Sequence, residues 1–212
     1  MGNAALVALP GRALFWPARS LLVVSDLHLG KSERLARRGG SLLPPYDTVA
    51  TLGRLAADLA ITGAQSVICL GDSFDDVAAG GALTIDDRNH LMALVTPRNW
   101  TWIMGNHDPV PATIGGQHHD EITLDGITFR HIPGNDPAAE VSGHYHPKAR
   151  IGATTRPCFL IDQARVIMPA YGTYTGGLWC DDPALRCLMR PKALAILTGT
   201  RSIARPMHLD RV

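Results

Sequence analysis

Five short apolar runs in this sequence each end in a cluster of polar residues, and this repeated pattern restricts the folds open to the chain. The runs are typical of buried strands, because they are brief, apolar and rich in β-branched residues. The clusters that follow them are Asp26-x-His28, Gly71-Asp72, Gly105-Asn106-His107-Asp108, His131 and Gly143-His144-Tyr145-His146. In α/β folds, ligands bind at the edge formed by the carboxyl ends of the strands. We therefore expect these clusters to meet at one edge.

Two helices are predicted between the first three strands. Asp47 is the predicted N-cap of the first, the apolar residues from Val49 to Leu59 follow the helical period, and Gly63 suits the C-terminal cap. The second is predicted from Thr84 to about residue 94. The first half therefore reads β-α-β-α-β, and the second half is strand-rich with glycine and proline turns. One α/β domain over residues 1–212 fits this order.

The first polar cluster is followed by Gly30-Lys31-Ser32, which resembles the end of a phosphate-binding P-loop. That motif needs a glycine five residues before Gly30, and this chain has Ser25 there. Because side chains alternate along a strand, Asp26 and His28 are expected to point to the same side, where a carboxylate and an imidazole suit a metal ion. No cysteine takes part. The four cysteines form no C-x-x-C pair and are interpreted as free thiols.

No apolar run approaches the roughly 18 residues of a membrane span, and the N-terminus lacks the basic region of a signal peptide. We therefore expect a cytoplasmic protein without membrane contact. The net charge is +4 over residues 1–40, −8 over 41–183 and +5 over 184–212. An acidic middle with basic ends is compatible with central metal ions and an anionic polymer at the edges, and equally with chance patterning of solvated faces.

Taken in order, the five clusters resemble the motifs of the calcineurin-like metallophosphoesterases: D-x-H, G-D, G-N-H-D/E, H and G-H-x-H. The resemblance implies an α/β (α+β) fold, a four-layer αββα sandwich of two mixed sheets flanked by helices. It also implies a dinuclear metal centre with seven ligands: Asp26, His28 and His146 for the first ion, Asp72 for both, and Asn106, His131 and His144 for the second.

The fourth motif is a single histidine, so its assignment is the least constrained. His118 and His119 compete with His131 for it. We favour His131, because it ends a predicted strand and precedes the last motif by a short interval.

The reaction implied by the resemblance is hydrolysis of a phosphoester. Two metal ions about 3.5–4 Å apart clamp the attacking and leaving oxygens of an in-line displacement. His107 is not a ligand in the family pattern and would donate a hydrogen bond or proton to the phosphoryl or leaving-group oxygen. Asp108 would orient that imidazole. Oxygen and nitrogen ligands without a thiolate suit Mn²⁺, Fe or Zn²⁺.

Within and around these motifs, the sequence resembles one branch of the family, the ligase-associated DNA-damage-response metallophosphoesterases. The residues that carry this resemblance are Leu29-Gly30-Lys31, Arg37-Arg38-Gly39, Leu43-Pro44, Gly71-Asp72-Ser73-Phe74, Ser142-Gly143-His144-Tyr145-His146-Pro147, Arg156-Pro157-Cys158-Phe159, Pro169-Ala170-Tyr171-Gly172 and Thr175-Gly176-Gly177. The branch implies phosphodiesterase or nuclease action on DNA, a preference for Mn²⁺, and association with a DNA ligase and a helicase in repair. One departure is Asp75, where the branch has histidine; it is not a metal position, so it bears on substrate contacts or tuning.

Six residues are candidates for substrate binding: Lys31, Arg34, Arg37, Arg38, Tyr171 and Tyr174. The basic four follow the first ligand pair. A helix would place Lys31, Arg34 and Arg38 on one face, where they would hold DNA phosphates or form a solvated basic segment. The two tyrosines lie in a glycine-rich segment that either stacks a base or forms a tight structural turn.

Three other functions stay open at this point. A small-molecule phosphohydrolase acting on nucleotides or cyclic nucleotides would need no basic arms. A lipid-precursor pyrophosphatase would carry an exposed apolar helix or flap, for which the sequence gives no strong sign. A non-catalytic scaffold on the same fold would tend to lose ligands or the catalytic histidine, whereas this chain retains all of them.

Overall fold

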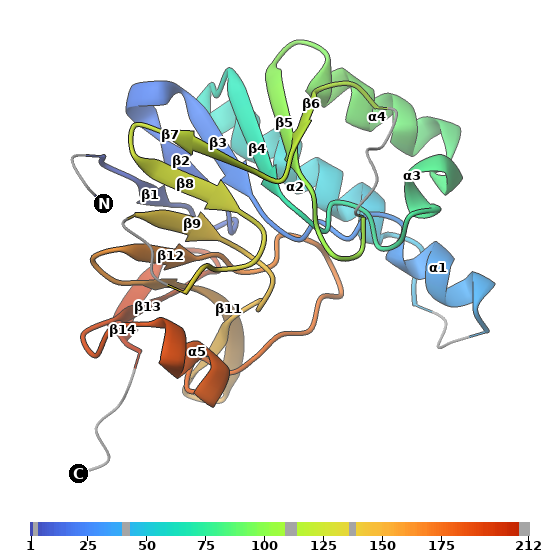
Figure 1. Ribbon diagram of the computed structural model, residues 1–212. Coiled ribbons are helices and arrows are strands. Elements are labelled where there is room, and N and C mark those ends of the chain that lie inside the picture. The colour runs from blue at the N-terminus through green and yellow to red at the C-terminus, as the bar shows by residue number, and fades with distance from the viewer. Residues whose placement is uncertain (2–3, 40–42, 109–113, 136–138, 208–212) are drawn as a thin grey trace.

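The computed structural model describes residues 1, 4–39, 43–108, 114–135 and 139–207, and its centre is a pair of β-sheets (Figure 1). The first sheet has the strand order β1-β2-β3-β4-β5-β6. Its strands are β1 (Val7–Ala8), β2 (Leu14–Trp16), β3 (Leu21–Val24), β4 (Ser66–Leu70), β5 (Asn99–Ile103) and β6 (Gln117–His119). Strands β3 to β6 are parallel, and β1 and β2 are antiparallel to their neighbours. The sheet is therefore mixed.

The second sheet is also mixed, with the order β14-β13-β11-β12-β9-β8-β7 and with β10 paired to β11. Its strands are β7 (Glu121–Leu124), β8 (Ile127–Arg130), β9 (Glu140–Ser142), β10 (Lys148–Ile151), β11 (Thr154–Ile161), β12 (Arg165–Ile167), β13 (Leu194–Leu197) and β14 (Ile203–Pro206). The β8–β9 and β9–β12 pairs are parallel, and the other pairs are antiparallel.

The helices of the described residues are α1 (Lys31–Arg37), α2 (Asp47–Thr62), α3 (Ala79–Ala82), α4 (Ile85–Val95) and α5 (Pro183–Leu188), with a 3₁₀ turn at Pro17–Arg19. Helices α2 and α4 pack on the first sheet, and α5 packs on the second (Figure 1). The layers are therefore helix, sheet, sheet and helix, which confirms the predicted fold class. None of these helices combines the length and apolar character that a membrane span requires.

Strand β3 shows why the central runs are continuously apolar. Leu22 and Val24 belong to the core between the first sheet and its helices, whereas Leu21 and Val23 belong to the core between the two sheets. Both faces of the strand are buried, so each position along it is apolar. The inter-sheet core is completed from the second sheet by residues such as Phe129.

The helix boundaries follow the sequence signals closely, with one correction. Gly63 ends α2 in the left-handed conformation (φ 63°), and the Thr84 side chain accepts the Asp87 backbone N–H at the start of α4. Asp47, however, does not cap α2. Its carboxylate accepts the backbone N–H groups of Lys31 (3.1 Å) and Ser32 (3.2 Å), so it caps α1 instead. The predicted free thiols are confirmed for all four cysteines.

Candidate metal centre

The polar clusters meet where strands of both sheets end. Four candidate ligands follow strands of the first sheet: Asp26 and His28 after β3, Asp72 after β4 and Asn106 after β5. Three follow strands of the second sheet: His131 after β8, and His144 and His146 after β9. The site therefore lies between the two sheets at their common edge, as the positions of the clusters predict.

The candidate ligands form two adjacent groups. In the first group, Asp26, His28 and His146 place ligand atoms within 4.8 Å of one another. In the second group, Asp72, His131 and His144 do the same. Asn106 joins the second group, because its Oδ1 lies 2.9 Å from His131 Nε2. The resemblance implies the same residues for the two ions, but it assigns Asp72 to both, whereas the structure groups Asp72 with the second set only. A third group, His28, Asp75 and His107, shares His28 with the first.

Contacts within and between the groups are short. Asp26 Oδ1 lies 2.9 Å from His146 Nε2, and Asp72 Oδ2 lies 3.4 Å from His131 Nε2. His131 Nδ1 lies 3.9 Å from Asp26 Oδ1, which connects the groups. His118 and His119 lie on edge strand β6, and the His118 ring stacks against Trp102. The structure thus brings His131, and not its two competitors, into the centre.

Electrostatic coupling within the second group is strong. Burial by itself would raise the pKa of Asp72 and lower the pKa of His131. The contact between them outweighs burial and lowers the pKa of Asp72 to about 2, while contacts with Asp72 and Asp26 raise the pKa of His131 to about 9. The two side chains therefore favour opposite charges.

Several buried polar atoms of the centre are incompletely paired among the described residues. His28 Nε2 has no hydrogen-bond partner there, and Asp26 Oδ1 and His146 Nε2 have an ion-pair contact with each other at 2.9 Å but no further hydrogen bond. Buried polar groups are normally paired, so this cluster of oxygen and nitrogen atoms needs a further partner. A divalent cation is such a partner, since carboxylate oxygen and imidazole nitrogen are its usual ligands. The donor set therefore fits the metal ions that the sequence motifs imply.

The ligand loops have an unusual backbone. Asp26 (φ 53°), His28 (φ 46°), Asp72 (φ 46°), His144 (φ 71°) and His146 (φ 48°) all adopt the left-handed conformation. Residues other than glycine rarely do so, and such conformations concentrate at functional sites. Strand β3 ends at residue 24, so Asp26 and His28 are brought together by this turn geometry. The expected alternation along a strand is therefore not the reason for their proximity.

Two of the motif glycines allow close approach. A Cβ at Gly71 would lie 2.5 Å from the His131 ring, and a Cβ at Gly105 would lie 2.2 Å from the backbone nitrogen of Asp72. Side chains at either position would push candidate ligands apart. The glycines in the sequence motifs are thus part of the packing of the centre.

His107 lies at the exposed side of the centre. Its backbone N–H donates to Asp72 Oδ1 (2.8 Å), and its Nδ1 lies 3.0 Å from the backbone carbonyl oxygen of Asp75. The prediction that Asp108 orients this imidazole is wrong. The Asp108 carboxylate instead accepts the backbone N–H groups of Ser73 (2.7 Å), Phe74 (3.1 Å) and Gly105 (3.1 Å). Asp108 holds the Asp72 and Asn106 loops together, and the imidazole is oriented by a main-chain carbonyl.

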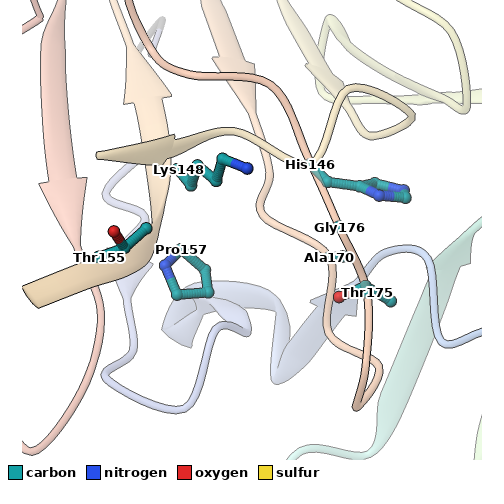
Figure 2. A pocket seen from close by; sticks show the side chains of 7 residues that line it. All are labelled: His146, Lys148, Thr155, Pro157, Ala170, Thr175 and Gly176. Atoms are coloured by element: carbon teal, nitrogen blue, oxygen red, sulfur yellow. The ribbon is translucent and has the colours of Figure 1, made fainter. Parts of the chain in front are cut away.

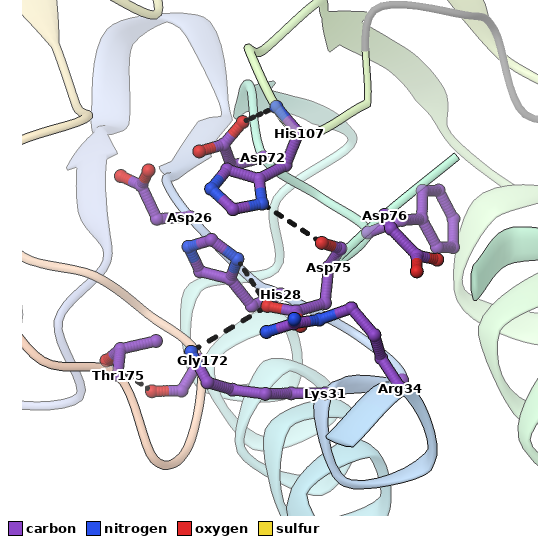
Figure 3. A network of polar contacts seen from close by, with 12 residues as sticks. Asp26, His28, Lys31, Arg34, Asp72, Asp75, Asp76, His107, Gly172 and Thr175 are labelled. Atoms are coloured by element: carbon purple, nitrogen blue, oxygen red, sulfur yellow. Dashed lines mark hydrogen bonds and ion pairs between the residues drawn. The ribbon is translucent and has the colours of Figure 1, made fainter. Parts of the chain in front are cut away.

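Asp75 connects the centre to helix α1. Its carboxylate is 1% exposed and lies 3.0 Å from His28 Nδ1 and 3.7 Å from Lys31 Nζ, and it pairs with Arg34 (Figure 3). Burial would raise the pKa of Asp75, but His28, Arg34 and Lys31 together hold it well below its usual range. Metal-binding histidines commonly place their second nitrogen against a carboxylate, which fixes the ring and raises its basicity. Asp75 is placed for this role beside His28, which the sequence did not indicate, because it depends on a tertiary contact.

The basic candidates for substrate binding are all paired with acidic residues. Lys31 and Arg34 contact Asp75, whereas Arg37 and Arg38 lie 3.4 Å and 3.6 Å from Asp76. Arg38 thus shares its acidic partner with Arg37, and not with Lys31 and Arg34, which are predicted to lie on the same helix face as Arg38. The positive charge of this segment is reduced accordingly. The end of the basic C-terminal region, residues 208–212, lies outside the described residues.

Tyr171 requires a correction. Its side chain is fully buried, and its hydroxyl donates to Asp58 Oδ2 (2.9 Å), so its ring cannot stack on a base. The segment around it packs on the ligand loops, since a Cβ at Gly172 would lie 2.2 Å from the Leu27 carbonyl oxygen. Tyr174 is 41% exposed and stays a candidate.

Replacing Asp75 by asparagine is expected to weaken divalent-metal binding by about 10- to 100-fold, because His28 loses its carboxylate neighbour. Titration of the metal-free protein with Mn²⁺ in a calorimeter measures this. The matched control is Asp76→Asn, which removes the adjacent carboxylate and affects only the pairs with Arg37 and Arg38. Equal affinities for the two variants would rule out a role for Asp75 at the centre.

A sequence model of the calcineurin-like phosphoesterases matches residues 19–171, so the chain belongs to this family. It is a hydrolase of phosphoester bonds, and its His/Asp groups are candidate sites for divalent metal ions. Among solved structures, it is similar to the nuclease MPE of Pseudomonas putida. The two sequences are 28% identical, the match covers 95% of this chain and 100% of that one, and the TM-score is 0.73.

The YfcE phosphoesterase of E. coli is a more distant structural relative, at 14% identity and a TM-score of 0.40, with 89% of this chain and 99% of that one covered. No curated protein matches the chain significantly.

Proposed function

We propose that this protein is a metal-dependent phosphodiesterase that cleaves DNA, using Asp26, His28, Asp72, Asn106, His131, His144 and His146 as ligands. The observation that carries the hydrolytic part is the pair of adjacent donor groups with His107 exposed beside them. The likeness to a nuclease over 95% of the chain supports DNA as the substrate.

The site suits an anionic diester. When bound, two divalent ions supply activation of water and neutralisation of charge on the phosphoryl oxygens. The carboxylates of Asp26 and Asp72 contribute two negative charges, which leave a doubly loaded site positive overall. A phosphodiester is attracted to such a site, and its transition state is stabilised there.

His107 is the proposed proton donor. The Asp75 carbonyl oxygen can only accept a hydrogen bond. Nδ1 of His107 therefore carries the hydrogen and donates a hydrogen bond to that oxygen. Nε2 is left to face the substrate. When Nε2 is also protonated, it donates to the phosphoryl or leaving-group oxygen. The backbone bond to Asp72 fixes this residue beside the ligands.

We further propose Mn²⁺ as the metal, a cytoplasmic location, and a DNA ligase and a helicase as partners in repair. This part rests on the resemblance of the sequence to the ligase-associated branch, chiefly in residues 169–177.

A small-molecule phosphohydrolase is the second candidate, and one observation favours it. The basic residues of α1 are paired with Asp75 and Asp76, which leaves less positive charge for a DNA backbone than the sequence suggests.

The test is an assay with Mn²⁺ on labelled single-stranded, duplex and nicked DNA, beside a dye diester with one phosphate. We expect cleavage of DNA and dye by the wild type. Asp72→Ala should abolish both, and His107→Ala should reduce both by about 10²- to 10⁴-fold. Cleavage of the dye without DNA would favour the second candidate, and cleavage of neither would contradict both.

A further inference from the structure

A cavity of about 130 Å³ lies directly beside the metal centre, on the side of the second sheet (Figure 2). His146, a candidate ligand, forms part of its wall, and Lys148, at the start of β10, forms another part. In Figure 2 the Lys148 side chain extends along the cavity with its amino group toward His146. A group bound here would be a close neighbour of the scissile phosphoryl group.

The charge of Lys148 is not neutralised within the described residues. No acidic side chain lies within ion-pair distance of it there, in contrast to the four basic residues of the α1 segment. Its amino group lies 4.9 Å from the ring centre of Trp179, and the Arg150 guanidinium lies 5.3 Å from the same ring. An aromatic face holds a cation in position without cancelling its charge. Lys148 is therefore a positioned and available cation.

The size of the cavity limits its occupant. Pockets that enclose whole small-molecule ligands are usually about 300–1,000 Å³, and this one is smaller. Thr155 and Pro157 form the opposite part of the wall (Figure 2). One cation in a space of this size suits a single phosphate group.

We propose that this cavity is a phosphate subsite in which Lys148 binds a second phosphate of the substrate, next to the one held at the metal centre. The inference rests on the proposed function, because the first phosphate must occupy the centre. A nucleic-acid strand supplies a phosphate at every nucleotide, and a nucleoside diphosphate also has two.

The strand is the favoured occupant. Beyond the cavity, Trp179 is 38% exposed and Arg150 is exposed on its ring, so the cationic surface continues outward from Lys148. Arg205 donates to the Arg150 carbonyl oxygen (2.7 Å) and adds a further positive charge nearby. A nucleoside diphosphate would extend no further than the cavity, whereas a nucleic-acid strand would also contact the cationic surface beyond it.

The test compares Lys148→Gln with the wild-type holoenzyme on three substrates: a labelled single-stranded oligonucleotide, adenosine diphosphate and the one-phosphate dye diester. We expect the ratio of kcat/KM for oligonucleotide over dye to fall by about three- to five-fold, mainly through KM. Lys148→Arg should restore the ratio. The control is Lys192→Gln, an exposed lysine beside a separate surface hollow, which removes the same charge and should leave the ratio unchanged.

A second measurement does not depend on catalysis. Fluorescence anisotropy of the oligonucleotide with the metal-free protein, repeated over a range of KCl concentrations, gives the salt dependence of binding. The slope for Lys148→Gln should be shallower by about 0.7–1 than that of the wild type. Equal slopes and equal ratios for the Lys148 and Lys192 variants would overturn the subsite.

The three substrates separate this inference from the proposed function. If Lys148→Gln lowered the ratio of kcat/KM for adenosine diphosphate over dye, but left the ratio for oligonucleotide over dye unchanged, a nucleic-acid strand would not be the occupant. If the wild type cleaved no DNA, the proposed function would fail. The subsite would then be supported only if Lys148→Gln still reduced turnover of the diphosphate relative to the dye. If the variant and the wild type had the same ratio of diphosphate to dye turnover, the subsite would be overturned.

Discussion

Replacing Gly105 by alanine is expected to lower kcat/KM for diester hydrolysis by at least about 100-fold. The new Cβ would lie 2.2 Å from both the backbone nitrogen and Oδ1 of Asp72, and 2.8 Å from Asp108 Oδ1. Backbone cannot move aside as a flexible side-chain end does, so Asp72 must shift. A displacement of about 1 Å at a reacting centre is enough to cost a factor of this size. Metal affinity, measured by calorimetry, should fall with the rate.

The matched control is Gly53→Ala in helix α2. A Cβ there meets nothing within 4 Å. Alanine is the better helix former, so this variant should keep its activity and gain about 0.5–1 kcal/mol in the free energy of unfolding. If Gly105→Ala kept wild-type kinetics and metal affinity, the position of Asp72 would not matter to the reaction, and its proposed role as the shared ligand would be wrong.

The second large effect concerns stability. Glu140→Ala is expected to lower the free energy of unfolding by about 3–5 kcal/mol. Glu140 and Arg165 are each 1% exposed, and Glu140 Oε1 lies 3.0 Å from Arg165 Nε. The guanidinium also donates to the backbone carbonyl oxygens of Leu188 (2.8 Å) and Gly134. Alanine would leave this cation buried without its counter-charge. Urea denaturation followed by circular dichroism measures the loss.

Glu121→Ala is the control for this variant. Glu121 Oε2 lies 2.6 Å from Arg130 Nη2 at the surface, and the Glu121 side chain is 51% exposed. Exposed pairs contribute about 1 kcal/mol or less, so this change should be small. The double variant Glu140→Leu with Arg165→Met should recover much of the stability, because it removes both buried charges. Equal losses for the two alanine variants would show that burial of the Glu140 pair has no special energetic weight.

The fold was predictable to the extent that it depends on local patterns. The apolar run over β3 and the caps at Gly63 and Thr84 are read from neighbouring residues, and the structure confirms them. Asp47 shows the limit of prediction from local patterns. Its position suits the cap of the helix that it begins, but its carboxylate binds backbone N–H groups some fifteen residues earlier. A capping side chain serves whichever unpaired N–H groups are nearest in space, and sequence alone does not locate them.

The candidate site was predictable in composition but not in orientation. The motifs identified the residues that gather, because each follows a strand that ends at the same edge. They did not reveal that Asp108 binds backbone N–H groups, that Tyr171 is buried, or that Asp75 reaches His28. Each of these depends on the direction of a side chain, which contacts between distant loops determine.

The division of the candidate ligands between the two sheets couples ion binding to the folding equilibrium. An ion that binds only when both sheets are docked stabilises the docked state by mass action, by about 2.7 kcal/mol at a free concentration one hundred times its Kd. Packing defects in the inter-sheet core, at Ile68 or Phe129 for example, would then appear as weaker ion affinity at a distance from the ligands. In a cell, the available metal would set how much sequence variation this core tolerates before the protein unfolds.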